Sequence, residues 1–156
     1  MSDFATSADA TNSAENNLQQ TVTEEQPQHE QLWDRLRAGY SLPDLDSPLV
    51  AKHERWYGSN PAYINRMVKR AHLYLYYIVD EVDKRGMPME IALLPAIESA
   101  FKPHAYSRAR AAGLWQFIPS TGKHFGLERN WWYDGRRDVV KATQAALDYL
   151  EELNKA

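Results

Sequence analysis

The sequence predicts an all-α protein, and three observations support this. Apolar residues recur with helical spacing over residues 60–85 and again over 138–156, and no segment alternates apolar and polar residues as a half-buried strand would. No Gly-rich phosphate loop and no internal repeat is present. With 156 residues, of which 44% are hydrophobic and 12% aromatic, the chain can bury one core of ordinary size.

The N-terminal part is polar and is expected to be disordered. Residues 1–29 are rich in Ser, Thr, Asn, Gln and Glu, and they offer too few apolar side chains to offset the entropy of ordering them. We therefore divide the chain into a tail, residues 1–29, and a helical domain, residues 30–156. A short helix is predicted at the start of the domain, at Gln31–Ala38, with Gly39 where that helix would stop.

The clearest helical pattern covers Asn60–Arg85. Asn60 is the predicted N-cap, Pro61 takes the first helical position and Gly86 follows the end. Apolar residues recur at intervals of three and four within it: Ile64, Met67, Val68, Ala71, Leu75, Ile78, Val79 and Val82. One long helix is therefore predicted here.

A buried helix is predicted at Pro88–Ala100, because this segment is almost wholly apolar. Pro95 inside it should bend the backbone or remove a hydrogen bond, so that the end carrying Glu98 departs from the ideal axis. Loops and short turns are predicted for the following residues, 102–118. A brief helix is then predicted at Pro119–Gly126, and a last one from Asp138 to the C-terminus.

Glu98 is the candidate for chemistry, since it directly follows the apolar run IALLPAI. Burial disfavours a charged carboxylate and raises its pKa, so a glutamate there could keep its proton near neutral pH and protonate a leaving group. Glycosidic cleavage requires such an acid. The competing interpretation is that Glu98 is a solvated or salt-bridged surface group near a helix end.

The run Gly113-Leu114-Trp115-Gln116-Phe117 combines an amide with aromatic rings, which suits carbohydrate. Gln116 can donate and accept hydrogen bonds with sugar hydroxyl or acetamido groups. The alternative is that Trp115 and Phe117 are core residues with Gln116 exposed between them. Trp131, Trp132 and Tyr133 carry the same two interpretations, as cleft lining or as core, and the sequence does not decide between them.

Several classes of function are disfavoured by composition. The net charge of −3 provides no general attraction to nucleic acid, and the absence of cysteine removes disulfides, thiolate chemistry and a lipoprotein cysteine. No signal peptide and no apolar run long enough for a membrane span are found. No metal site is expected, because the five histidines lack ligand spacing: His29, His53, His72, His104 and His124.

Two stretches, LLPAIESAFKPHAYSRARAAGLWQFIPSTGKHFGL and WWYDGRRDVVKATQAALDYL, resemble the transglycosylase SLT domain of lytic transglycosylases, and the likeness covers about residues 32–153. The resemblance implies a lysozyme-like helical fold without a cofactor. It implies that Glu98 is the catalytic acid and base, that Ser99 supports the site and that Gln116 contacts the substrate. Five further residues match the family pattern and are expected to cap or form salt bridges: Tyr106, Ser107, Asp134, Arg136 and Arg137.

The resemblance also implies the reaction. The substrate would be the glycan strands of peptidoglycan, cut between N-acetylmuramic acid and N-acetylglucosamine to leave 1,6-anhydromuramoyl ends, in the periplasm or cell envelope. SLT domains continue to an Ala-Tyr-Asn motif, often followed by LysM repeats, and this sequence contains neither. We therefore expect an incomplete catalytic domain, less stable and less active than a longer form. The competing hypothesis is a non-catalytic helical module that binds glycan or another protein.

Overall fold

The computed structural model describes residues 31–155, which fall into two units that divide between Ala38 and Gly39. In the first unit residues 31–38 are helical, as predicted. An exposed ion pair between Arg37 and Asp34, at 2.8 Å, lies on this helix. The tail predicted for residues 1–29, and the boundary placed at its end, lie outside the described residues and stay predictions.

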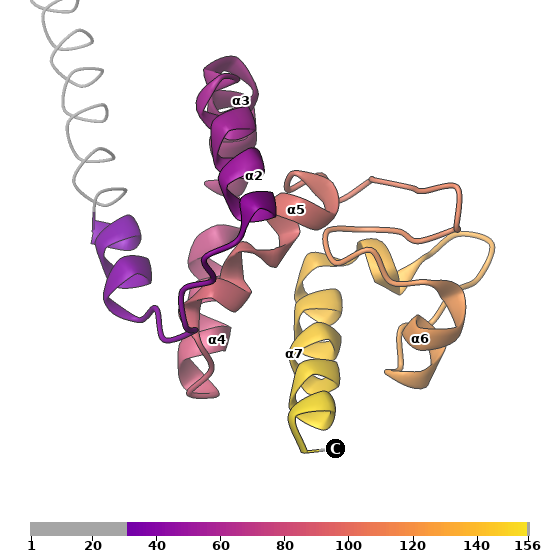
Figure 1. Ribbon diagram of the computed structural model, residues 1–156. Helices are drawn as coiled ribbons and strands as arrows, with labels where there is room; N and C mark the ends of the chain where they lie inside the picture. Colours follow the sequence, from indigo (N-terminus) through magenta and orange to yellow (C-terminus); the bar gives the residue numbers. More distant parts are fainter. Residues whose placement is uncertain (1–30, 156) are drawn as a thin grey trace, which may run out of the picture. The chain divides into compact units, whose positions relative to one another are not determined.

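The second unit is helical, so the all-α prediction is confirmed for residues 31–155, where only isolated bridges and no strand occur. Figure 1 labels its α-helices. In chain order the elements are α2 (Pro48–Gly58), α3 (Pro61–Ala71), α4 (Leu75–Lys84), the 3₁₀ helix η1 (Met89–Leu93), α5 (Leu94–Ser99), α6 (Pro119–His124), the 3₁₀ helix η2 (Gly135–Arg137) and α7 (Val139–Lys155).

Helix α2 was not predicted, although it has a recognisable start. Ser47 is its N-cap and accepts a hydrogen bond from the backbone N–H of Leu49 at 3.2 Å, and Pro48 takes the first helical position. None of its residues is buried. Because a helix without a buried face needs no apolar stripe, periodicity could not reveal it.

The single helix predicted at Asn60–Arg85 is wrong: the structure has two helices, α3 and α4. Between them the backbone tightens, with the N–H of Leu73 bonded to the carbonyl of Arg70 and that of Tyr74 to the carbonyl of Ala71. No Gly or Pro marks this break, and the apolar spacing runs through it. Tertiary packing therefore placed a turn where local sequence favours continuous helix.

Asn60 is the N-cap of α3, as predicted, and its carbonyl accepts the N–H of Ile64 at 3.2 Å, but its side chain makes no cap hydrogen bond. Its Nδ2 instead donates to the carbonyl of Trp56 at 2.7 Å, near the end of α2. Asn60 therefore opens α3 with its backbone carbonyl, while its side chain closes the preceding helix. Pro61 does take the first turn of α3, and Gly86 adopts a left-handed φ of 62° after α4, as the sequence indicated.

The buried helix predicted at Pro88–Ala100 is wrong in two respects. It consists of η1 followed by α5, and much of it is half-exposed, with Ile97 75% exposed. Pro95 lies in the first turn of α5, where a missing N–H leaves no helical hydrogen bond unmade. The predicted bend is therefore replaced by a change of helix type just before the proline.

The core of the second unit lies where α4 meets α7, which run side by side in Figure 1. Helix α4 buries Leu75, Ile78, Val79 and Val82, and α7 buries Ala142, Ala145, Ala146 and Leu147 among others. The helices predicted at Pro119–Gly126 and after Asp138 are confirmed as α6 and α7. Asp138 starts α7 by accepting the N–H of Lys141 on its carboxylate at 3.0 Å.

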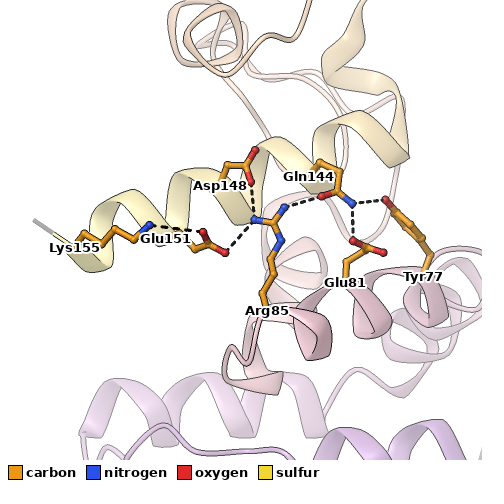
Figure 2. Close-up of polar contacts among 7 residues, drawn as sticks. All are labelled: Tyr77, Glu81, Arg85, Gln144, Asp148, Glu151 and Lys155. Carbon is orange, nitrogen blue, oxygen red and sulfur yellow. Dashed lines mark hydrogen bonds and ion pairs between the residues drawn. The ribbon is translucent and has the colours of Figure 1, made fainter.

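A polar network joins the same two helices at their edge (Figure 2). The Arg85 guanidinium donates to Asp148 at 2.6 Å, to Glu151 at 3.2 Å and to the amide oxygen of Gln144 at 2.7 Å. Gln144 in turn donates to Tyr77 and Glu81 of α4. Because η1 and α5 follow α4 in the chain, this network helps to fix the segment that carries Glu98 relative to α7.

Candidate active site

Glu98 lies in the last turn of α5, just before a sharp reversal of the backbone. Ala100 and Phe101 both have left-handed φ angles, 51° and 56°, which is uncommon for residues other than glycine. The N–H of Phe101 bonds to the carbonyl of Pro95, and the Arg70 side chain donates to the carbonyl of Ala100 at 2.7 Å. These bonds satisfy the end of α5 and hold the turn beside Glu98.

Burial of Glu98 was predicted and is not found, because its side chain is exposed at the end of α5. Of the two residues before it, Ala96 is half-buried and Ile97 is exposed. The apolar residues that precede Glu98 in the sequence did not lead to burial of Glu98, since the six-residue helix α5 presents only part of its surface to the core. The exposed alternative, left open by the sequence, therefore describes the position of Glu98 correctly.

Ser99 is buried, at 8% exposed, and does not line the pocket that contains Glu98. Its hydroxyl donates to the carbonyl of Pro95, one turn earlier, at 3.1 Å. The contact closes α5 from within. Any support that Ser99 provides to Glu98 would thus act through the helix backbone.

Gln116 is positioned by a strained loop that is held by hydrogen bonds. Its backbone has a left-handed φ of 50°, and bridges pair Ala112 with Tyr106 and with Phe117 around it. The side-chain Nε2 donates to the carbonyl of Gly113 at 2.8 Å and approaches that of Ala105 at 3.4 Å. The amide is therefore directed by its own loop before any ligand arrives.

Glu98 and Gln116 line one pocket of about 330 Å³, although 18 positions separate them in the chain. Its wall is completed by side chains from the Gln116 loop, α5, α6 and α7: Leu94, Trp115, Phe117, Ile118, Thr121, Ala146, Tyr149 and Leu150. Sequence reasoning did not single out Thr121 or Tyr149. Neither residue carries a local signal: Thr121 lies on the short helix α6, and Tyr149 lies on α7, which contributes residues both to the core and to the pocket wall.

The aromatic residues beside Gln116 serve the core and the pocket together. Phe117 is 5% exposed and packs with Leu127 in a small apolar cluster, which Trp115 also contacts. The indole N–H of Trp115 donates to the hydroxyl of Thr143 on α7 at 3.0 Å. The two interpretations of these rings are therefore not exclusive.

Arg136 anchors the Gln116 loop from behind. It is 2% exposed, and its guanidinium donates to the carbonyls of Arg110 and Phe117 at 2.7 and 3.0 Å and to the Asp134 carboxylate at 2.7 Å. Hydrogen bonds from Arg136 lower the pKa of Asp134, against an opposing effect of burial. Asp134 also accepts the N–H of Arg136, so its predicted capping and salt-bridge roles are confirmed.

The other residues matched to the family pattern also have local structural contacts. The Ser107 hydroxyl accepts the N–H of Ala111 at 3.1 Å, and the Arg137 guanidinium lies over the Tyr106 ring, 5.8 Å from its centroid. Within residues 31–155 no group of three His, Asp or Glu side chains is arranged to hold a metal ion. Over the same residues no helix is long and apolar enough to cross a bilayer.

Comparison with known proteins decides the family. Residues 76–156 match the transglycosylase SLT domain. The chain belongs to this family. The SLT domain is a lysozyme-like helical fold, so the fold expected from the resemblance is confirmed. The match contains all of α4 except Leu75, the elements from η1 to α7, and with them Glu98, Ser99 and Gln116.

Curated relatives of this SLT protein agree. It is 48% identical over 122 residues to membrane-bound lytic murein transglycosylase D of Escherichia coli (strain K12), covering 78% of this chain and 26% of the relative. It is 54% identical over 86 residues to an Alteromonas sp. (strain M-1) protein named for tributyltin chloride resistance, covering 55% and 42%. Membrane-bound lytic murein transglycosylase C of Glaesserella parasuis serovar 5 (strain SH0165) is 31% identical over 88 residues, covering 56% and 21%. The chain spans about a quarter of the length of transglycosylase D.

Proposed function

We propose that this SLT domain cleaves the glycan strands of peptidoglycan in the cell envelope, between N-acetylmuramic acid and N-acetylglucosamine, with formation of 1,6-anhydromuramoyl ends. We assign the domain to residues 30–156. The observation that carries the proposal is the placement of a carboxylate, Glu98, and an amide, Gln116, in one pocket with aromatic walls. Family membership and the lytic murein transglycosylase names of two relatives support the substrate.

One carboxylate suffices for this reaction. Protonated, Glu98 donates its proton to the glycosidic oxygen of the leaving sugar; as a carboxylate, it then accepts the proton of the muramoyl C6 hydroxyl. That hydroxyl attacks the anomeric carbon and closes the anhydro ring. An internal nucleophile held in position has a high effective concentration, so it outcompetes water and no second carboxylate is needed.

Gln116 would hold the sugar beside Glu98. Its Nε2 is bonded within the loop, whereas its Oε1 has no hydrogen-bond partner among residues 31–155 and can accept one from a substrate hydroxyl or acetamido N–H. Trp115 and Tyr149 on the pocket wall offer ring faces to sugars. Closure of the pocket on a glycan strand would exclude water from Glu98 and from the reacting sugar.

The test is digestion of purified sacculi, with anhydro ends counted by mass spectrometry. Glu98→Gln should abolish product while leaving the circular dichroism spectrum unchanged, because the amide matches the carboxyl in size but supplies no acid proton. Gln116→Ala should lower turnover by less, about 5- to 150-fold, since losing one or two substrate hydrogen bonds costs roughly 1–3 kcal/mol. Glycan binding without new chain ends in the unsubstituted protein would instead support a non-catalytic binding module.

A further inference from the structure

Two tryptophans lie outside the candidate active site and are almost fully exposed. Trp131 is 88% and Trp132 90% exposed, which removes the core interpretation that the sequence had left open for them. With Arg129, Arg137 and His104 they line a pocket of about 470 Å³ that shares no residue with the Glu98 pocket. Adjacent indoles exposed to water do not help folding, so an exposed pair of this kind indicates a contact surface.

The loop that carries the indoles is held in one conformation. The side-chain oxygen of Asn130 accepts the backbone N–H groups of Trp132 and Tyr133, both at 2.8 Å, and the N–H of Asn130 donates to the carbonyl of Tyr133 at 2.8 Å. A bridge between Arg129 and Asp134 closes the loop at its base. The indoles are therefore presented before a ligand binds, which lowers the entropy cost of binding.

Two positive side chains in this pocket lack an ion pair within residues 31–155, and its two carboxylates are engaged in local contacts. The Asp134 carboxylate is paired with Arg136, and that of Asp138 accepts the Tyr133 hydroxyl at 3.0 Å and a backbone N–H of α7. Neither Arg129 nor Arg137 forms an ion pair with another residue of the described part of the chain. Guanidinium groups beside aromatic faces suit a ligand that combines sugar rings with carboxylates.

We propose that this pocket is a second binding site for peptidoglycan, which takes a segment of glycan together with the carboxylates of its peptide stem. Sugar rings would stack on Trp131 and Trp132, and a stem carboxylate would pair with Arg129 or Arg137. The choice of polymer rests on the proposed function, but the geometry of the pocket does not depend on catalysis. Such a site would hold the strand while Glu98 acts at the other pocket.

The test measures binding in the Glu98→Gln background, so that the ligand is not cut. A soluble disaccharide-tetrapeptide released from peptidoglycan is titrated calorimetrically, beside the same disaccharide without its peptide. Replacing both Trp131 and Trp132 by Ala should weaken binding of the disaccharide-tetrapeptide at least tenfold. Arg129→Gln should weaken it severalfold while leaving the peptide-free disaccharide unchanged, and Trp132→Phe should preserve most of the affinity.

Trp56→Ala is the matched control, since Trp56 is also exposed, at 48%, but lies on α2 away from this loop. Thermal unfolding should be unchanged in the Trp131, Trp132 and Arg129 variants, whereas Trp56→Ala removes edge contacts with Tyr57 and Tyr63 and serves as the control for ligand affinity alone. Affinity within twofold of the parent after loss of both indoles would overturn the proposal, as would an equal loss of affinity in Trp56→Ala. It would also be overturned if loss of both indoles abolished a dimer of this protein and left ligand binding unchanged. If the Glu98→Gln protein still cleaved peptidoglycan fully, the proposed catalytic role of Glu98 would be wrong. The comparison of binding between the tryptophan variants and their parent would remain valid.

Discussion

Gly113, next to the loop that presents Gln116, has no room for a side chain. Its φ is +83°, and a Cβ built there would lie 1.8 Å from the backbone carbonyl oxygen of Arg136. Gly113 thus allows the Gln116 loop to approach η2 closely, and Arg136 then bonds to the carbonyl of Phe117. A residue first noticed as part of a sugar-binding motif therefore has a packing reason of its own.

Gly113→Ala should lower the free energy of unfolding by about 3 kcal/mol, from steric overlap and left-handed strain together. Urea denaturation followed by circular dichroism measures it. Gly58→Ala is the control: it ends α2, has nothing within 4 Å of the added Cβ, and should stabilise by about 0.4–1 kcal/mol. Equal stability of the two variants would show that the loop moves away from η2 at little cost.

At the scale of elements, the short η2 helix connects the pocket loop to α7. Asp134 caps it and pairs with Arg136, whose buried guanidinium would otherwise lack a counter-charge. Because the folded-state pKa of Asp134 is lowered, the pair stabilises the fold fully above the unfolded pKa of an aspartate, near 3.9. That contribution is lost as the pH falls through the lower folded pKa.

Asp134→Asn should therefore cost about 3 kcal/mol at pH 7, since it leaves Arg136 buried without its charge partner. The difference from the unsubstituted protein should shrink as the pH is lowered below about 4, where Asp134 begins to protonate in the unfolded chain, and continue to shrink towards its lower folded-state pKa. Thermal unfolding from pH 7 down to pH 3 measures this. Asp44→Asn, at an exposed position, should show no such pattern, and a constant difference at every pH would contradict the assigned pairing.

At the scale of the whole second unit, Arg85 joins α4 to α7 across more than 60 residues of sequence. Only 18% of its side chain is exposed, and it serves three acceptors on α7. Arg85→Gln should lower the free energy of unfolding by about 1.5–3 kcal/mol, the usual worth of hydrogen bonds to charged groups. The network in Figure 2 would then lose the hydrogen bonds of its central side chain, which help to fix the position of α5 relative to α7.

Lys84→Gln provides the comparison, because the neighbouring Lys84–Glu81 pair has a lysine that is 68% exposed. A surface pair of this kind contributes about 0.5 kcal/mol or less and weakens further with salt. Denaturation at low and high salt measures both variants. If Arg85→Gln is no more destabilising than Lys84→Gln, apolar packing alone holds the two helices together.

Local sequence determined the fold class, the last two α-helices and the motif residues, because amphipathic spacing, proline positions and the Glu-Ser and Gly-Leu-Trp-Gln runs are all local properties. It did not determine the break between α3 and α4, the 3₁₀ start of the Glu98 segment or the exposure of Glu98, because these depend on which surface each helix presents to the rest of the unit. Tertiary structure alone brought Glu98 and Gln116 to one pocket and placed Trp131 and Trp132 at another. Proximity across 18 or more residues arises from packing and long-range hydrogen bonds such as those of Arg70, Arg85 and Arg136, whose partners no local pattern identifies.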